Sequence, residues 1–260
     1  MDLSQIKNKL AAVSSKAGKG EKKPNVFWKP TVGKQTIRVI PSKFNKKDPF
    51  TELFLNYKLG KTILSPTNFG EKCPIDQFVK KLRETSDKEN WKLSGKLESK
   101  MRVFLPVVER GKESEGVKLW AFGKELYMDF LNLADNEDVG DFTDILEGRD
   151  IVVTTVGPDV TGTEFNKSSI MPRTKQTPLS DDKKLVKLLL EEQPDPKEAF
   201  PRYTFDEIKE MLHKFLSPEE ESEGEVMDIK KDSKPESKKE VSTTKNEKGK
   251  KFDNLFEDEK

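Results

Sequence analysis

The residues that could perform chemistry in this sequence are limited by its two scarcest side chains. The chain has one cysteine, Cys73, and one histidine, His213, so it can build neither a disulfide framework nor a Cys/His zinc cluster. A Ser-His-Asp or Cys-His catalytic site would have to use His213. We expect that histidine at the end of a helix, as a partner of the helix dipole. Phosphate-binding glycine motifs are absent from the sequence.

The many carboxylates do not fall in a recognised catalytic spacing. Asp141 and Asp144 could share a metal ion, but 37% of the residues are charged, and in such a chain we favour a solvated helix face for the pair. The sequence therefore predicts a protein without catalytic residues, metal ligands or a cofactor.

Aromatic rings with lysines close by in the sequence form the more informative pattern. Trp91, Trp120 and Phe165 each have a lysine within four residues. Single-stranded nucleic acid stacks its bases on such rings while cations follow its phosphates, and each stacked base contributes roughly 1–3 kcal/mol. Trp91 and Phe165 have few apolar neighbours, so we expect both rings to be exposed. Trp120 lies in an apolar strand, and for this ring we give a buried and an exposed position equal weight.

Hydrophobic periodicity predicts the elements that must hold these rings. Strands are expected over residues 35–40, 52–57, 101–109, 117–122 and 150–156, and helices over 74–83, 124–133, 180–192 and 204–216. Thr204 and Glu207 form a capping box at the start of the last helix. Residues 84–96 are polar, and we expect them to be mobile. This order predicts a mainly β fold with helices, an OB-type Greek-key barrel with insertions, although an α+β sandwich would give a similar order.

Composition and charge divide the chain into four parts. We expect a basic N-terminal arm over residues 1–25, an OB-fold core over 26–179 with an inserted subdomain at about 57–90, a two-helix extension over 180–216 and a disordered tail over 217–260. Residues 217–260 hold 10 basic and 14 acidic side chains, which leaves 38 and 33 for residues 1–216. The tail is therefore net negative and the predicted folded region net positive.

The tail ends in an acidic stretch with three apolar side chains that nothing nearby in the sequence can bury. We predict that these residues bind a protein partner: Phe252, Leu255 and Phe256. The sequence shows neither an apolar run of bilayer length nor the apolar core of a secretory signal, so we expect a cytoplasmic protein.

An ordered set of short motifs resembles the single-stranded DNA-binding, helix-destabilising proteins of T-even-type phages, the gene thirty-two type. The matching stretches are IRVIPSK (37–43), PF (49–50), CP and QF (73–74 and 77–78), FLPVV (104–108), WAFGK (120–124) and the two-helix end at 180–216. The resemblance implies an OB fold with a basic cleft lined by aromatic side chains. It also implies self-association along DNA through the N-terminal arm, replication and recombination partners for the tail, and the cytoplasm of an infected bacterial host.

The resemblance further implies a zinc site, and here the sequence departs from the family. The positions that correspond to its ligands read Tyr57, Leu64, Cys73 and Asp76. One thiolate cannot hold a structural zinc ion, so we predict a metal-free subdomain. Its apolar packing should involve Leu64, Phe69, Ile75 and Phe78.

Together these observations predict a non-catalytic protein that coats single-stranded DNA, independent of sequence, in phage DNA replication, recombination and repair. The predicted stacking residues are Trp91, Trp120 and Phe165, and the predicted phosphate contacts are Arg38, Lys43, Lys96, Lys100, Arg102, Lys124 and Lys167. An RNA-binding OB-fold regulator, a replisome scaffold that binds only proteins, and a metal-dependent nuclease remain open as alternatives.

Overall fold

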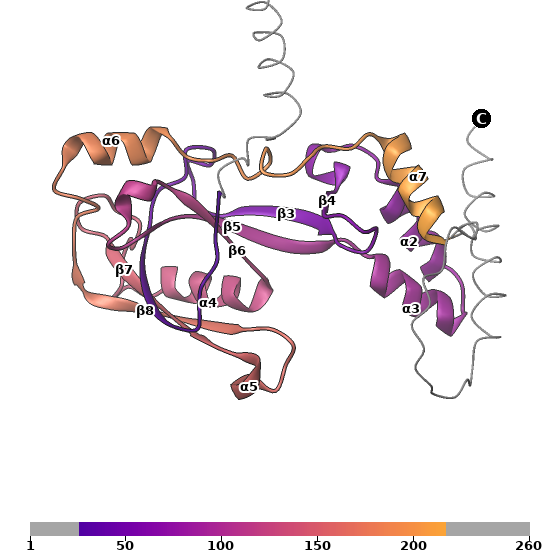
Figure 1. The fold of residues 1–260 in the computed structure, drawn as a ribbon, viewed down its shortest axis with the longest axis horizontal. Coiled ribbons are helices and arrows are strands. Elements are labelled where there is room, and N and C mark those ends of the chain that lie inside the picture. Colours follow the sequence, from indigo (N-terminus) through magenta and orange to yellow (C-terminus); the bar gives the residue numbers. More distant parts are fainter. Residues whose placement is uncertain (1–25, 217–260) are drawn as a thin grey trace, which may run out of the picture. The chain divides into compact units, whose positions relative to one another are not determined.

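The computed structural model describes residues 26–216 (Figure 1). Residues 1–25 and 217–260 lie outside the described residues, and with them the predicted arm, the predicted tail and the predicted partner-binding residues Phe252, Leu255 and Phe256. The described chain divides into two compact units. Unit 1 comprises residues 26–51 and 103–196, and unit 2 comprises residues 52–102 and 197–216.

Unit 1 is built on a mixed sheet with the strand order β1-β6-β5-β2-β7-β8. These strands are β1 (Phe27–Trp28), β2 (Gly33–Val39), β5 (Lys100–Glu109), β6 (Lys118–Phe122), β7 (Arg149–Val156) and β8 (Lys167–Gln176). β1 pairs with β6 in parallel, and the other neighbours on this path are antiparallel. Along β7, Ile151 and Val153 are buried while Val152 and Thr154 are more exposed, the alternation of a sheet with one buried face.

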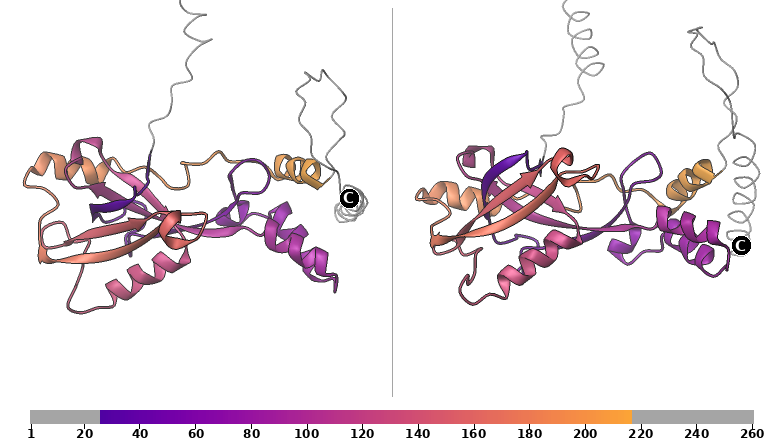
Figure 2. Two further views of the ribbon diagram at one scale, coloured as in Figure 1. Left: turned by 60° about the horizontal axis from the view of Figure 1, so that its bottom comes forward. Right: turned by 90° about the horizontal axis from the view of Figure 1, so that it is seen from below.

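Aromatic side chains form much of the core of unit 1. The helix α4 (Lys124–Ala134) lies alongside the β7–β8 pair (Figure 2) and buries Phe130. The Phe130 ring stacks on Phe122 with 5.3 Å between centroids and meets Trp120 edge-on at 5.7 Å. The remaining helical elements of this unit are η2 (Glu113–Glu115), α5 (Pro158–Thr161) and α6 (Lys183–Glu191).

Unit 2 packs three helices around an apolar cluster. Its elements are β3 (Thr51–Asn56), β4 (Ile63–Leu64), η1 (Pro66–Phe69), α2 (Pro74–Arg83), α3 (Lys88–Leu97) and α7 (Phe205–Leu216). β3 pairs with β4 and with β5, whose first residues belong to this unit. The cluster takes Phe78 from α2, Leu97 from α3 and Leu212 from α7, together with Ile75 and the Cys73 thiol. Helices distant in sequence therefore share one core.

The predicted packing of the subdomain is partly confirmed. Ile75 and Phe78 belong to the apolar cluster, and Leu64 is buried outside it. Phe69 is instead only partly buried, and the guanidinium of Arg202 lies 4.1 Å from the centre of its ring. An aromatic ring contacted by a cation in this way is a surface feature rather than a core residue.

The expectation of a mobile segment over residues 84–96 is wrong, because α3 occupies most of it. The Asp87 side chain accepts a hydrogen bond from the Glu89 N–H and begins the helix. Its buried face carries Asn90 and Ser94 beside Leu97. Two of these three side chains are small and polar, so a search for apolar residues at helical spacing does not detect the helix.

The other predicted strands and helices are confirmed to within three residues at each end. The capping box is also present: the Glu207 N–H donates to Thr204 Oγ1 at 3.3 Å, and the Thr204 N–H donates to Glu207 Oε2 at 2.7 Å. The predicted two-helix extension is divided, because α6 belongs to unit 1 and α7 to unit 2. The described fold is mainly β with helices, consistent with an OB-like core.

Candidate nucleic-acid interface

Trp91 is the exposed tryptophan of unit 2. It lies on α3, and 56% of its surface is accessible, which confirms the exposure expected from its polar neighbours. The Arg83 guanidinium lies 5.9 Å from the ring centroid, and the adjacent Lys92 pairs with Glu89 at 2.9 Å. A large accessible ring beside cations is the arrangement on which a base can stack while its phosphates are neutralised.

The other predicted cations of unit 2 remain at its surface. Lys96 and Lys100 are exposed, and Arg102 is half-buried. Lys100 Nζ lies 3.2 Å from a carboxylate oxygen of Glu98, and the Arg102 guanidinium lies 5.9 Å from the ring centroid of Tyr57. Exposed pairs of this kind are weak in water, so these cations can exchange their partners for a phosphate.

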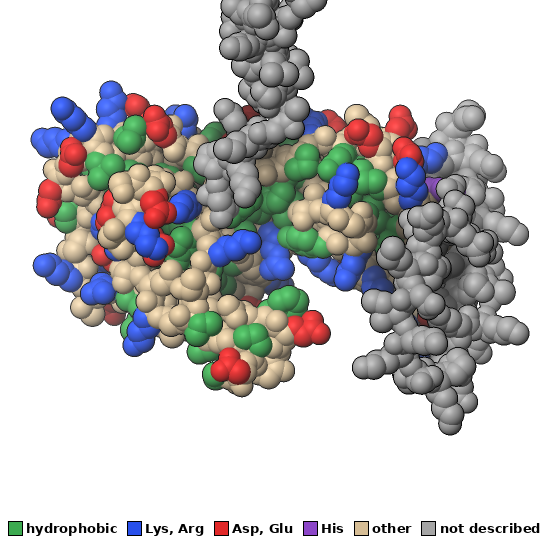
Figure 3. Space-filling model, in the orientation of Figure 1, with side chains coloured by type: hydrophobic (Ala, Val, Ile, Leu, Met, Phe, Trp, Pro, Cys, Tyr) green, Lys and Arg blue, Asp and Glu red, His purple; other side chains and the backbone are tan. Residues whose placement is uncertain are grey.

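Phe165 and Lys167 form the corresponding feature on unit 1. Phe165 is 75% exposed in the loop between α5 and β8, as expected from the sequence. Figure 3 shows hydrophobic and acidic side chains gathered at the tip that carries α5, with Lys and Arg side chains elsewhere on the same face of the unit. Lys167 lies 3.8 Å from Glu125, and both side chains are largely exposed.

The outward face of β2, β7 and β8 extends this cationic surface. The register aligns Lys34 with Thr154 and Thr154 with Ser169, and on the same face Val152 pairs with Met171. β8 also exposes two cations that are not among the predicted phosphate contacts, Arg173 and Lys175. β8 itself was not predicted, because an edge strand that contains a proline and few buried residues lacks apolar alternation.

Trp120 is a core residue, so the prediction that it stacks on a base is wrong. Only 2% of its surface is accessible. It lies on β6, between β1 and β5, and its ring meets Trp28 edge-on with 5.0 Å between centroids. The sequence did not distinguish a buried from an exposed position for Trp120, and the structure places its ring in the core of unit 1.

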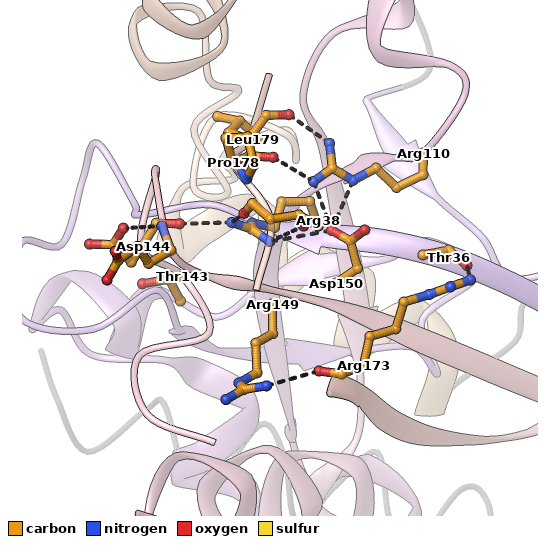
Figure 4. A network of polar contacts seen from close by, with 12 residues as sticks. Thr36, Arg38, Arg110, Thr143, Asp144, Arg149, Asp150, Arg173, Pro178 and Leu179 are labelled. Carbon is orange, nitrogen blue, oxygen red and sulfur yellow. Dashed lines mark hydrogen bonds and ion pairs between the residues drawn. The ribbon is translucent and has the colours of Figure 1, made fainter. Parts of the chain in front are cut away.

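Arg38 is also buried, with an accessible surface of 0%, and the prediction that it contacts phosphate is wrong. Figure 4 shows its guanidinium within a network of polar contacts. It donates to Asp150 at 3.3 Å, to the Asp144 carbonyl at 2.9 Å and to the Thr177 carbonyl at 2.6 Å. Burial lowers the pKa of Arg38, while the Asp150 carboxylate acts in the opposite direction.

The Arg38 guanidinium lies so close to the backbone at position 148 that only glycine fits there. A Cβ at this position would lie 2.6 Å from Arg38 Nη2 and would also clash with the Asp144 carbonyl oxygen. Arg38 pairs with Asp150 in the β2–β7 ladder, and the segments that contain Asp144 and Thr177 cover its side chain.

Two further arginines of unit 1 donate hydrogen bonds to backbone carbonyls. Arg110 binds Asp150 at 2.7 Å and donates to the carbonyls of Pro178 and Leu179 at 3.0 and 2.6 Å. Arg149 donates to the carbonyls of Arg173 and Thr174 and to those of Val139 and Asp138. These three arginines satisfy backbone groups that lack ladder partners, and they have a structural role.

Lys43 and Lys124 are exposed cations of unit 1. The Lys43 ammonium donates to the Glu191 carbonyl at 2.9 Å, and Lys124 begins α4. The loop that contains Lys43 continues into one wall of a cavity of about 740 Å³, together with residues of α4 and the segment 140–143. The lysines of that wall are Lys46 and Lys47.

The side chains of Asp141 and Asp144 accept hydrogen bonds from residues of their own loop. Asp141 accepts hydrogen bonds from the N–H and hydroxyl of Thr143, and Asp144 accepts from the N–H groups of Leu146 and Glu147. The two latter bonds lower the pKa of Asp144. Among residues 26–216, no group of three His, Cys, Asp or Glu side chains is arranged to hold a metal ion. Nor does any helix in that part of the chain have the length and hydropathy to span a membrane.

Comparison with known sequences identifies the family to which the chain belongs. No curated protein matches the chain. The sequence model of one protein family, described as gp32 DNA binding protein like, matches residues 31–217. This match spans most of the chain and includes nearly all of both units, with the exposed Trp91 and Phe165. The chain therefore belongs to the gp32-like family of DNA-binding proteins.

Proposed function

We propose that this protein coats single-stranded DNA without regard to sequence and without catalysis, in phage DNA replication, recombination and repair. The observation that carries the proposal is the exposure of two rings in a chain of a DNA-binding family: Trp91 beside the Arg83 guanidinium, and Phe165 two residues before the exposed Lys167. Stacking accepts every base because every base has a π-face. Cations that meet phosphates likewise read no sequence.

The proposed contacts differ from those expected from the sequence. Without Trp120 and Arg38, the stacking residues are Trp91 and Phe165. The phosphate contacts are proposed to be Lys43, Lys96, Lys100, Arg102, Lys124 and Lys167, joined by Lys34, Arg173 and Lys175 of the β2–β7–β8 face. If about four phosphates are neutralised at a time, the logarithm of affinity should fall with the logarithm of salt with a slope of roughly −3.

A fluorescence titration with oligo-dT at several salt concentrations tests the proposal. Trp28 and Trp120 are buried, so a change of emission on binding should come from Trp91. We expect quenching in the wild-type protein, its loss in Trp91→Phe, and near wild-type affinity of Trp91→Phe by anisotropy because phenylalanine still stacks. A salt slope near zero would contradict the electrostatic part of the proposal. A matched RNA oligomer that binds more tightly would favour the RNA-binding alternative.

We propose three further roles for the ends of the chain, from charge, composition and the family resemblance. The acidic residues of 217–260 should compete with phosphate for the cations of the folded units, and Phe252, Leu255 and Phe256 should bind replication proteins. The basic residues of 1–25 should support self-association along DNA. Deletion of residues 217–260 is expected to raise affinity for oligo-dT, most clearly at low salt, where screening is weakest. Equal or lower affinity after deletion would contradict the competition.

A further inference from the structure

Glu98 lies between two cations on the surface of unit 2. Its Oε1 atom is 2.8 Å from Arg83 Nη2, and its Oε2 atom is 3.2 Å from Lys100 Nζ. The three residues come from different elements: Arg83 ends α2, Glu98 follows α3 and Lys100 begins β5. The fold of this unit therefore brings two cations from separate segments onto one anion.

The same arginine also contacts the exposed tryptophan. The Arg83 guanidinium lies 5.9 Å from the ring centroid of Trp91 while one of its nitrogens holds Glu98. A nucleotide needs an aromatic face for its base and, close by, cations for its phosphate. Arginine suits the second task because its planar fork matches the oxygens of a phosphate. Ring and cations are thus arranged for one nucleotide, with a carboxylate where the phosphate would lie.

Helix stability does not account for a carboxylate at this position. Glu98 is the C-cap residue of α3, where the negative end of the helix dipole disfavours an anion. Its side chain is 40% exposed and those of Arg83 and Lys100 are 37% and 53% exposed, so the pairs stabilise the unit only weakly. The Arg83 hydrogen bond, opposed by partial desolvation, lowers the pKa of Glu98, so the carboxylate is charged at neutral pH.

We propose that Arg83 and Lys100 form a phosphodiester-binding site, which Glu98 occupies when DNA is absent and leaves when a strand binds. Arg83 then joins the DNA-binding residues, and Glu98 limits how tightly unit 2 holds the strand. The proposal rests on the proposed function. It deepens that function by assigning an internal competitor to the surface around Trp91.

A double-mutant cycle on the full chain tests the competition. At about 0.15 M salt, where charges separated by more than about 8 Å are largely screened, Glu98→Gln should bind oligo-dT about 1.5-fold to fivefold more tightly than wild type, the range that an exposed ion pair is worth. Arg83→Gln should bind more weakly, and Glu98→Gln should give a smaller gain in that background, because only Lys100 is then left to be released. The control is Glu210→Gln, which removes the same charge from an exposed pair with Lys214 on α7 and should leave affinity unchanged.

Two results would overturn the proposal: a gain for Glu98→Gln no larger than that for Glu210→Gln, or a gain that is undiminished without Arg83. A second measurement does not depend on DNA binding. The side-chain Nε–H resonance of Arg83, assigned by its loss in Arg83→Gln, should shift more with inorganic phosphate in Glu98→Gln than in wild type. Equal shifts would also refute the site. If wild type fails to bind oligo-dT, the proposed function fails and the phosphate titration alone decides the site.

Discussion

Replacement of Arg38 by methionine should destabilise this protein by about 3 kcal/mol, at the lower end of the 3–5 kcal/mol that is lost when one partner of a buried ion pair is removed. Methionine keeps much of the apolar stem but removes every donor. The carbonyls of Asp144 and Thr177 would then lose the hydrogen bonds that Arg38 donates to them, and Figure 4 shows the first of these. Asp150 keeps its contact with Arg110 at 2.7 Å, which is why we expect the lower end of the range.

Thermal unfolding followed by circular dichroism measures this effect. For a chain of this size about 1 kcal/mol corresponds to roughly 2–4 °C, so we expect the Tm of Arg38→Met to fall by about 6–12 °C. Lys124→Met is the matched control, since it removes an exposed cation and should change stability by less than about 0.5 kcal/mol. Below its Tm, Arg38→Met should keep the wild-type salt slope for oligo-dT, whereas Lys124→Met should flatten it by about 0.7. An unchanged Tm for Arg38→Met together with a flatter salt slope would refute the structural role of this arginine.

Four other substitutions test the roles of single residues in binding and in folding. Trp91→Ala should weaken oligo-dT binding by roughly 1–3 kcal/mol with little change in Tm, whereas Trp120→Ala should lower the unfolding free energy by about 3–5 kcal/mol; the opposite pattern in titration and melting would reverse their assignments. Gly148→Ala should lower the Tm because its Cβ has no room, and a wild-type melting curve would contradict this. Hydrogen bonds from Thr204 lower the folded-state pKa of Glu207, so its stabilisation is complete above the unfolded value of about 4.3 and is lost as pH falls through the folded value. Unfolding curves of wild type and Glu207→Gln should therefore converge on acidification, and a constant difference between them would contradict the capping role.

Local patterns predicted most of the elements because their signals lie within a few residues. The helix α2 has Phe78 and Leu82 at helical spacing, and the capping box of α7 lies within four residues. α3 was missed because its buried face carries Asn90 and Ser94, whose burial depends on the packing of the unit. β8 was missed because an edge strand needs no apolar alternation.

The sequence alone determined the scarcity of reactive side chains, the family resemblance and the exposure of Trp91 and Phe165, since a ring without apolar neighbours in its own segment has little to bury it. Only the tertiary structure decided which of the remaining aromatic and cationic residues face solvent. Trp120 and Arg38 are buried by chain segments that lie far from them in sequence, and Arg83 and Lys100 both contact Glu98 through the packing of two helices and a strand. Residue type sets what a side chain can bind, whereas burial and nearby charges, which depend on the whole fold, set whether it can reach a ligand.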